Sequence, residues 1–176
     1  ENVVFLLEFL AVICALFLVA YGAEKWAKKV SGDSERVLST RKIAVIGVFS
    51  AISAVLMLFE FPVPFAPPFY KIDFSELPAL IGTFAYGPVA GVMIELCKIV
   101  LKLLMKGTTT AFVGDLANFA IGCSFLLPAS IIYLLKKTRK NAVVGCVSGT
   151  LVMTVIGTAF NAVYLLPKFA ELYGMP

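Results

Sequence analysis

The chain has 176 residues, of which 60% are hydrophobic and only 15% charged, and its mean hydropathy is +0.96. A soluble domain of this size carries roughly 25% charged residues, so the composition excludes a small water-soluble globule and indicates a membrane protein. The formal net charge of +4 does not indicate a nucleic-acid partner, because the basic residues gather at the ends of apolar segments, as membrane orientation requires.

The N-terminal part of the chain predicts two membrane spans. Residues 3–22 are apolar apart from Glu8, and they lack the basic n-region that opens a signal peptide. A basic, polar linker follows over residues 24–42. The second span is predicted from about residue 43 to 61, where Pro62 ends it.

The next segment, residues 61–76, contains four prolines and five aromatic residues. The prolines forbid a regular helix, and non-helical backbone at a membrane is tolerated where protein buries it or where it lines a cavity. Two interpretations stay open. The segment is a binding loop, or it is a belt of aromatic side chains anchored at the membrane interface.

Residues 78–105 are long enough for one tilted helix, but Tyr86-Gly87-Pro88 interrupts them. Proline breaks the helical hydrogen-bond ladder, and the glycine before it permits a tight turn. We therefore expect two helices here, over about 77–86 and 88–105.

Residues 111–135 and 142–166 predict two further spans; Pro167 ends the second, and an amphipathic tail follows. Basic residues cluster in the first linker and again at 136–140. With both clusters in the cytoplasm, ten of the 15 Lys and Arg residues lie inside. This parity requires the two-helix hairpin. The proline-rich segment, the polar turn at 106–110 and the tail then all face outward, where they could form one pocket.

Ionisable groups within spans are costly and indicate function. Glu95, Lys98 and Lys102 are spaced i, i+3 and i+7, so they share one helical face. One interpretation is an internal Glu95–Lys98 ion pair, with Lys102 reaching toward the outer surface. The other is a polar wall that faces a ligand. Both stay open for Lys98, whereas the internal pair is favoured for Glu95.

For other polar and small residues, two interpretations also stay open. Asp115 and Asn118 lie at the outer end of their span and contact either a ligand or a neighbouring helix. Asn161 hydrogen-bonds either an amide-like or imide-like ligand edge or another helix. Gly47 and Ala51 form a small-residue pair that serves packing within the chain or docking of another membrane subunit.

Signals for enzymes and metal sites are missing from the sequence. His is absent, the four cysteines lie singly in apolar runs, and no zinc-protease, phosphate-binding-loop or G-x-S-x-G motif occurs. Intramembrane catalysis by paired aspartates is disfavoured because only Asp115 lies within a span. We expect a protein that is not an enzyme and that holds no metal and no cofactor.

Several motifs over residues 41–176 resemble, in unbroken order, the riboflavin-specific S components of energy-coupling factor (ECF) transporters. They are PFAPPF at 64–69, DFSELP at 73–78, FAYGPVAG at 84–91, ANFAIG at 117–122, and Asn161 followed by Leu166-Pro167 and Leu172-Tyr173-Gly174. The resemblance implies an all-α, polytopic transmembrane helical bundle in a bacterial plasma membrane. It also implies a subunit that captures riboflavin outside and works with a transmembrane coupling subunit and two cytoplasmic ATPases.

The resemblance implies roles for particular residues. Asn161 matches an asparagine that hydrogen-bonds the flavin, the loop around 69–73 matches the segment that covers it, and Lys71 stands where some members have a ligand-contacting threonine. Gly47 and Ala51 match the face that docks the coupling subunit. Together with the residue-based candidates, the expected substrate-binding set is Phe69, Tyr70, Lys71, Asp73, Phe74, Lys98, Asn118 and Asn161.

The resemblance also sets an expected organisation of about six spans. Residues 1–40 would form an extra N-terminal transmembrane helix and a basic cytoplasmic linker, and residues 41–176 the S-component core without the last of its six helices. Two alternatives are an S component for another vitamin and a membrane accessory subunit that binds no small ligand.

Overall fold

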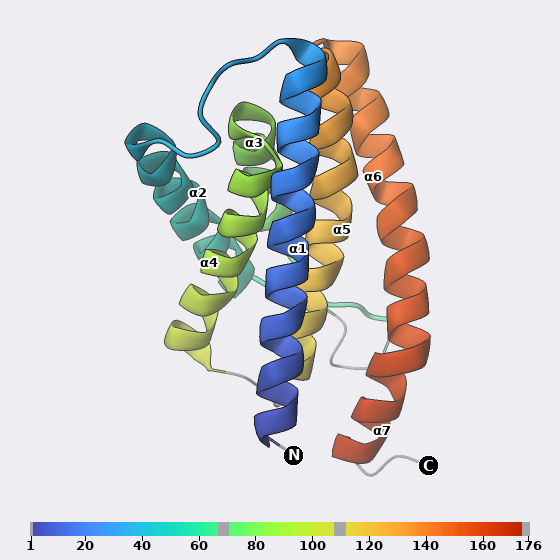
Figure 1. The fold of residues 1–176 in the computed structure, drawn as a ribbon. Helices are drawn as coiled ribbons and strands as arrows, with labels where there is room; N and C mark the ends of the chain where they lie inside the picture. Colours follow the sequence, from blue (N-terminus) through green and yellow to red (C-terminus); the bar gives the residue numbers. More distant parts are fainter. Residues whose placement is uncertain (1, 67–70, 108–111, 174–176) are drawn as a thin grey trace.

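The protein's structure, a computed structural model, describes residues 2–66, 71–107 and 112–173. It is an all-α bundle with one short two-stranded ribbon, which confirms the predicted fold class (Figure 1). In chain order the elements are α1 (Asn2–Ser31), α2 (Thr40–Leu58), β1 (Phe61–Pro62), β2 (Lys71–Ile72), α3 (Glu76–Tyr86), α4 (Pro88–Lys106), α5 (Val113–Leu135), α6 (Arg139–Phe160), the π-helical turn η1 (Asn161–Leu165) and α7 (Leu166–Tyr173).

Four helical runs in the described part of the chain are long and apolar enough to cross a membrane: 7–31, 40–58, 113–135 and 139–168. The helix α3 is too short for this criterion, and α4 carries three charged side chains in its interior. In the described part of the chain, α1, α2, α3, α4, α5 and the continuous run from α6 to α7 make six helices, in line with the expectation of about six spans. Four of the six are long and apolar enough to be hydrophobic spans.

Helix α1 is longer than predicted, because the residues assigned to the linker from Glu24 onward continue it to Ser31. Alanine, lysine and glutamate favour helix, and Glu24 forms an i, i+4 ion pair with Lys28 at 2.9 Å. Gly32, at a φ of 71°, follows the helix in the left-handed conformation that commonly ends one.

The predicted break between α3 and α4 is present. Gly87 has a φ of 100°, which favours glycine, and Pro88 occupies the first position of α4, where its missing N–H costs nothing. Helix α3 has 11 residues and is about 16 Å long, roughly half the thickness of a hydrocarbon core. Figure 1 shows it beside only the upper half of the bundle.

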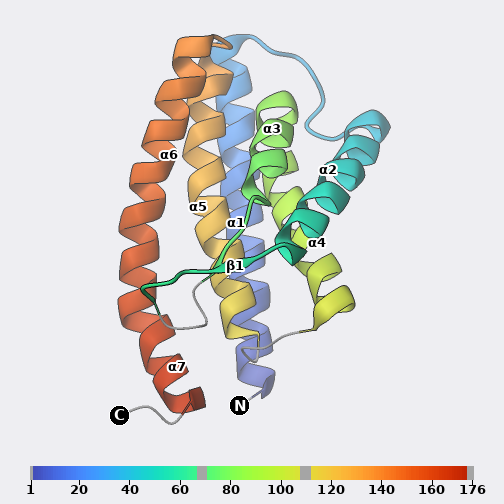
Figure 2. The same cartoon turned by 180° about the vertical axis from the view of Figure 1, so that it is seen from behind.

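Between α2 and α3, residues 59–66 and 71–75 form no helix, as predicted, and two short strands in them pair with each other. Strands β1 and β2 are antiparallel, with Phe61 opposite Ile72 and Pro62 opposite Lys71. In Figure 2 the segment leaves the end of α2 and runs across the lower half of the bundle before the chain enters α3. A proline at the edge of a two-stranded ribbon loses no required hydrogen bond.

The prediction that Pro167 ends the last span is wrong, because the helix continues to Tyr173. The turn before the proline is π-helical, and the Leu166 N–H donates to the Asn161 carbonyl. A proline clashes with the carbonyl four residues earlier. The wider π turn shifts those carbonyls, so the helix can continue past the proline.

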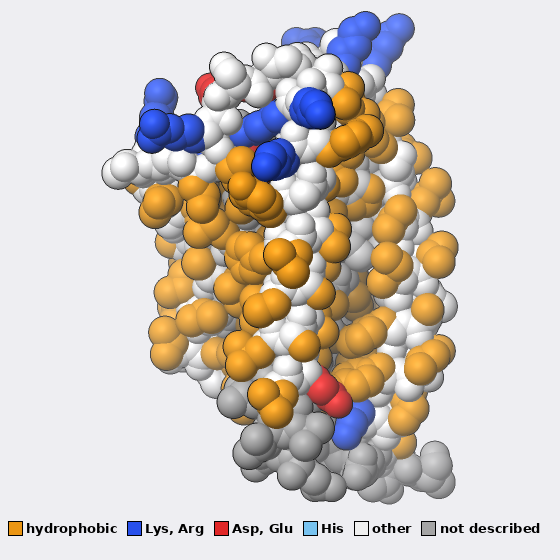
Figure 3. All heavy atoms as spheres, viewed as in Figure 1, with side chains coloured by type: hydrophobic (Ala, Val, Ile, Leu, Met, Phe, Trp, Pro, Cys, Tyr) orange, Lys and Arg blue, Asp and Glu red, His pale blue; other side chains and the backbone are white. Residues whose placement is uncertain are grey.

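Helix α5 is central and packs against α1, α4 and α6. The closest approach is to α6, where a Cβ on Gly145 or Gly149 would lie 2.6 Å from a backbone carbonyl oxygen of α5. Lys and Arg side chains gather at one end of the molecule and apolar side chains cover its flanks (Figure 3). The first linker and the α5–α6 turn lie at that same end, as the parity of the spans requires.

Candidate ligand-binding site

One face of α4 and one face of the antiparallel helix α5 carry polar side chains that meet inside the bundle and form a polar seam. On α4 the seam contains Glu95, Lys98 and Lys102, and on α5 it contains Asp115 and Asn118. Glu76, in the first turn of α3, closes the seam where the proline-rich segment enters that helix. These six side chains are called the polar seam below.

Lys98 lies at the centre of the seam and is fully buried. Its Nζ is 2.7 Å from Oε1 of Glu76 and 2.8 Å from Oε2 of Glu95. The anticipated Glu95–Lys98 ion pair is therefore present. Glu76 joins it from another helix, a role that the sequence did not reveal.

Lys102 does not reach toward the outer surface, so that expectation is wrong. Its Nζ lies 2.6 Å from Oδ1 of Asp115, which is 2% exposed. The pair ties α4 to α5 one helical turn from Lys98. A lysine in a span often extends its charged end toward water, but here the buried carboxylate of Asp115 binds the Lys102 ammonium instead.

Four side-chain oxygens of the seam are buried and have no hydrogen-bond partner among the described residues. They are Oε2 of Glu76, Oε1 of Glu95, Oδ2 of Asp115 and Oδ1 of Asn118. An unsatisfied buried polar group costs about 1–3 kcal/mol, so such groups usually bind water or a ligand. The seam is thus rich in acceptors and suits a ligand that offers several donors.

Gly122 on α5 makes room for the carboxylates of the seam. A Cβ at this position would lie 2.6 Å from Oε2 of Glu95 and 3.2 Å from Oε1 of Glu76. In the sequence, Gly122 stands out only as the last residue of the ANFAIG motif. The need for a glycine appears once α3, α4 and α5 are seen together.

Of the predicted loop residues, the structure describes Lys71, Asp73 and Phe74, which lie just before α3. Phe69 and Tyr70 fall outside the described residues. Phe74 is 63% exposed, and Oδ1 of Asp73 accepts the Ser75 N–H at 2.7 Å at the start of α3. Lys71 is exposed, and its Nζ lies 2.5 Å from Oε1 of Glu60.

Glu60 also contacts Lys106 at the end of α4. Glu60, Lys71 and Lys106 are called the outer ion cluster below, and they tie the base of the proline-rich segment to α4. Burial by itself would raise the pKa of Glu60, but hydrogen bonds from Lys106 and Lys71 outweigh it and hold that pKa below its usual range.

Asn161 is half-buried at the first position of the π turn. This turn packs on the outer half of α5 through Leu165, which lies in one apolar cluster with Val113 and Ala117. The Tyr164 hydroxyl donates to Oε2 of Glu8 on α1 at 3.4 Å. The structure therefore places Asn161 near the half of α5 that carries Asp115 and Asn118.

Gly47 and Ala51 lie on an exposed face of α2. A Cβ added at Gly47 would meet no heavy atom within 4 Å, so the small residue is not required by packing within this chain. The face is consistent with docking of another helix, and it lies away from the polar seam.

Comparison with known proteins gives consistent matches. A family model described as the ECF transporter, substrate-specific component, matches residues 41–176. The riboflavin transporter FmnP of Bacillus subtilis is 37% identical over 140 residues, covering 79% of this chain and 74% of that protein. The riboflavin transporter RibU of Staphylococcus aureus is 42% identical over 135 residues, covering 77% and 70%.

A solved structure also matches, described as "Structure and mechanism of the S component of a bacterial ECF transporter". Its TM-score is 0.67 at 41% sequence identity, and the match covers 77% of each chain. Helix α1 and the linker after it lie before the residues that the family model matches.

Proposed function

This chain belongs to the family of substrate-specific components of ECF transporters, and from that premise we propose that it captures riboflavin at the outer face of the membrane. It is a multi-pass protein of a bacterial membrane. The bound vitamin is then delivered inward with an ATPase-driven coupling module.

The observation that carries the proposal is the set of buried, unsatisfied acceptor oxygens in the polar seam. Riboflavin carries an imide N–H and the hydroxyl groups of its ribityl chain, which are donors of the kind these oxygens need. The same molecule has a flat aromatic ring. A ring of this kind buries well against aromatic side chains, with about 0.5–1.5 kcal/mol of stacking per pair.

We propose the following division of roles among the candidate residues. Phe69, Tyr70 and Phe74 of the proline-rich segment cover the ring, with Lys71 and Asp73 shaping that segment. Asn118 of α5 and Asn161 of the π turn bond polar edges of the ligand. Lys98 acts on the ligand through the carboxylates that it holds in place.

The outer ion cluster supports a gating role for the proline-rich segment. Glu60 binds Lys71 of the segment and Lys106 of α4. Opening the segment would break the Glu60–Lys71 contact, which lies at the surface and is therefore weak. A weak contact of this kind suits a covering loop that must open for each vitamin.

The partners are proposed to be one transmembrane coupling subunit and two cytoplasmic ATPases. The coupling subunit docks on the α2 face that contains Gly47 and Ala51, where small residues let a second helix approach closely. The sequence contains no phosphate-binding loop of its own, so energy from ATP must come from such partners.

The test is an absorption spectrum of the natural full-length protein purified in detergent, followed by titration of the flavin-free protein with riboflavin. We expect saturable one-to-one quenching of flavin fluorescence. Asn118→Leu should weaken binding at least tenfold. Thr154→Val is the control, because that exposed hydroxyl donates to the Thr150 carbonyl on α6 and contacts no other polar group among the described residues.

Absence of flavin binding by the folded full-length protein would refute riboflavin as the cargo. Competition by a different vitamin at lower concentration would assign the protein to that ligand. Equal affinity of Asn118→Leu and the wild type would refute the placement of the ligand in the seam.

A further inference from the structure

A basic hollow of about 450 Å³ lies at the end of the bundle opposite the proposed riboflavin site. It opens between the α1–α2 linker, the first turn of α2 and the end of α3. Arg36 and Ser39 contribute from the linker, Arg41 and Lys42 from α2, and Tyr86 from α3. The positive-inside rule places this end in the cytoplasm.

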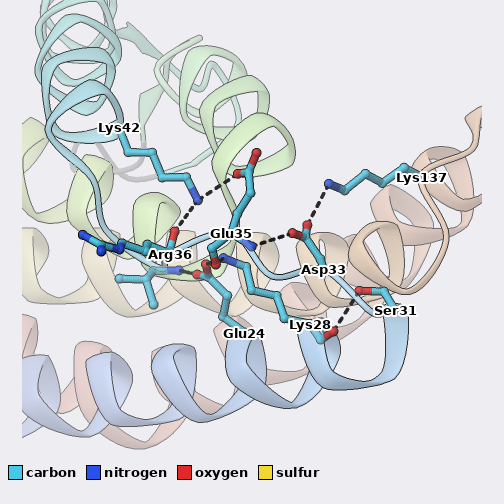
Figure 4. Close-up of polar contacts among 9 residues, drawn as sticks. Glu24, Lys28, Ser31, Asp33, Glu35, Arg36, Lys42 and Lys137 are labelled. Atoms are coloured by element: carbon cyan, nitrogen blue, oxygen red, sulfur yellow. Dashed lines mark hydrogen bonds and ion pairs between the residues drawn. The ribbon is translucent and has the colours of Figure 1, made fainter.

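The acidic side chains around the hollow are already engaged. Glu35, on its wall, pairs with Lys42 at 3.5 Å. Further along the linker, Asp33 pairs with Lys137 at 3.2 Å and accepts the Glu35 N–H. Figure 4 shows these contacts, together with the Lys42 ammonium that donates to the Arg36 carbonyl at 2.8 Å.

Two guanidinium groups are left over. The side chains of Arg36 and Arg41 are exposed, and neither forms a hydrogen bond or an ion pair with any residue that the structure describes. Counting Glu35 and Lys42, the wall carries three basic groups and one acid, a net charge of +2. Paired arginines match the oxygens of a phosphate, because each guanidinium presents a planar fork of donors.

The first turn of α2 adds to this preference for anions. Ser39 caps the helix by accepting the Lys42 N–H at 3.3 Å, and the hollow opens at that helix end. The N-terminus of a helix carries a partial positive charge and favours phosphate.

An apolar stripe leads away from the hollow along α3. Leu77 is 59% exposed and Ile81 is 50% exposed. Each lies four residues from the next along the series Leu77, Ile81 and Ala85, and Ala85 lines the hollow. The three residues therefore share one face of the helix. A phosphate site joined to an exposed apolar stripe has the two-part character of a phospholipid, with a charged headgroup and an acyl chain.

We propose that this hollow binds the phosphate headgroup of an anionic phospholipid of the cytoplasmic leaflet, with an acyl chain along the α3 stripe. Basic pockets between transmembrane helices at the cytoplasmic side are known to favour such headgroups. Arg36 and Ser39 precede the residues that the family model matches, whereas Arg41, Lys42 and Tyr86 lie within them. The lipid would join the N-terminal extension to the family core.

The test uses the full-length protein in neutral detergent, with binding of phosphatidylglycerol and phosphatidylcholine followed by native mass spectrometry. We expect saturable binding of phosphatidylglycerol and a loss of about tenfold or more in affinity for the double variant Arg36→Gln/Arg41→Gln. The matched control is Arg139→Gln/Lys140→Gln, which removes the same charge from exposed residues at the same end. Circular dichroism checks that each variant is folded.

Three results would overturn the proposal. The first is unchanged phosphatidylglycerol binding by Arg36→Gln/Arg41→Gln. The second is an equal loss in the control variant, which would show non-specific attraction to the basic end. The third is full competition by water-soluble glycerophosphoglycerol at the same concentration as the lipid, which would show that the apolar stripe has no role.

Discussion

Replacing Glu24 with alanine is expected to loosen the attachment of α1 to the rest of the bundle. The Glu24 carboxylate is fully buried, and its Oε2 accepts the Val89 N–H at 3.1 Å. That N–H belongs to the first turn of α4, so it has no hydrogen-bond acceptor within its own helix. The other oxygen pairs with Lys28 at 2.9 Å, so one side chain serves two helices (Figure 4).

The size of the effect follows from these contacts. Removing one partner of a buried ion pair costs about 3–5 kcal/mol, because the other charge is left uncompensated. Lys28 is 7% exposed and keeps a hydrogen bond to the Glu35 carbonyl, which places Glu24→Ala near the lower end of that range. Glu24→Gln should cost less, because an amide oxygen still accepts the Val89 N–H.

The assay is the free energy of unfolding in mixed micelles, measured by titration with a denaturing detergent and circular dichroism. The double variant Glu24→Gln/Lys28→Met removes both charges of the pair. Its loss of unfolding free energy should be smaller, by about 1–3 kcal/mol, than the summed losses of Glu24→Gln alone and Lys28→Met alone. The reasoning is refuted if Glu24→Ala costs less than about 0.5 kcal/mol, a typical surface value. Strict additivity in the double variant would refute the ion pair as the cause.

Three further predictions concern the seam, the packing and the outer cluster. Gly122→Ala should weaken riboflavin binding about tenfold in a flavin titration, since the new methyl would lie 2.6 Å from a carboxylate oxygen of Glu95. Gly145→Ala should lower the thermal midpoint by several degrees, because its methyl meets a backbone carbonyl at 2.6 Å, whereas Gly157→Ala, with 3.8 Å of room, should not. Because the pKa of Glu60 is lowered, the outer ion cluster stabilises the closed loop fully above the usual glutamate pKa of 4.5. This stabilisation is lost as the pH falls from 4.5 through the lowered pKa of Glu60. Riboflavin release, timed by stopped flow, should therefore accelerate below pH 4.5 in the wild type and change little with pH in Glu60→Gln.

Local chemistry made much of the fold predictable. Gly87 and Pro88 together mark the break between α3 and α4, because one permits the turn and the other suits a helix start. The spacing of Glu95, Lys98 and Lys102 likewise identified one face of α4 as polar before any neighbour was known. Each of these inferences needs only residues within about two helical turns.

What could not be predicted depends on contacts between distant residues. Glu24 looks like part of a charged linker until Val89, 65 residues later in the chain, is placed beside it. Glu76 joins Lys98 only because α3 begins at mid-depth. Pro167 is a usual helix stop, and the π turn that carries the helix past it has no sequence signal as plain as the proline itself.

The charged interior of α4 has a consequence for how the protein enters the membrane. Each charge at the centre of an isolated helix opposes insertion by about 2.5–3.5 kcal/mol, and α4 carries three such residues. Glu95 and Lys98 pair within α4, but Lys98 also pairs with Glu76 of α3, which is too short to cross alone. Lys102 pairs with Asp115 of α5, which is synthesised later. Helix α4 is therefore expected to remain at the translocon until α5 has been synthesised, so that α3, α4 and α5 insert into the bilayer together.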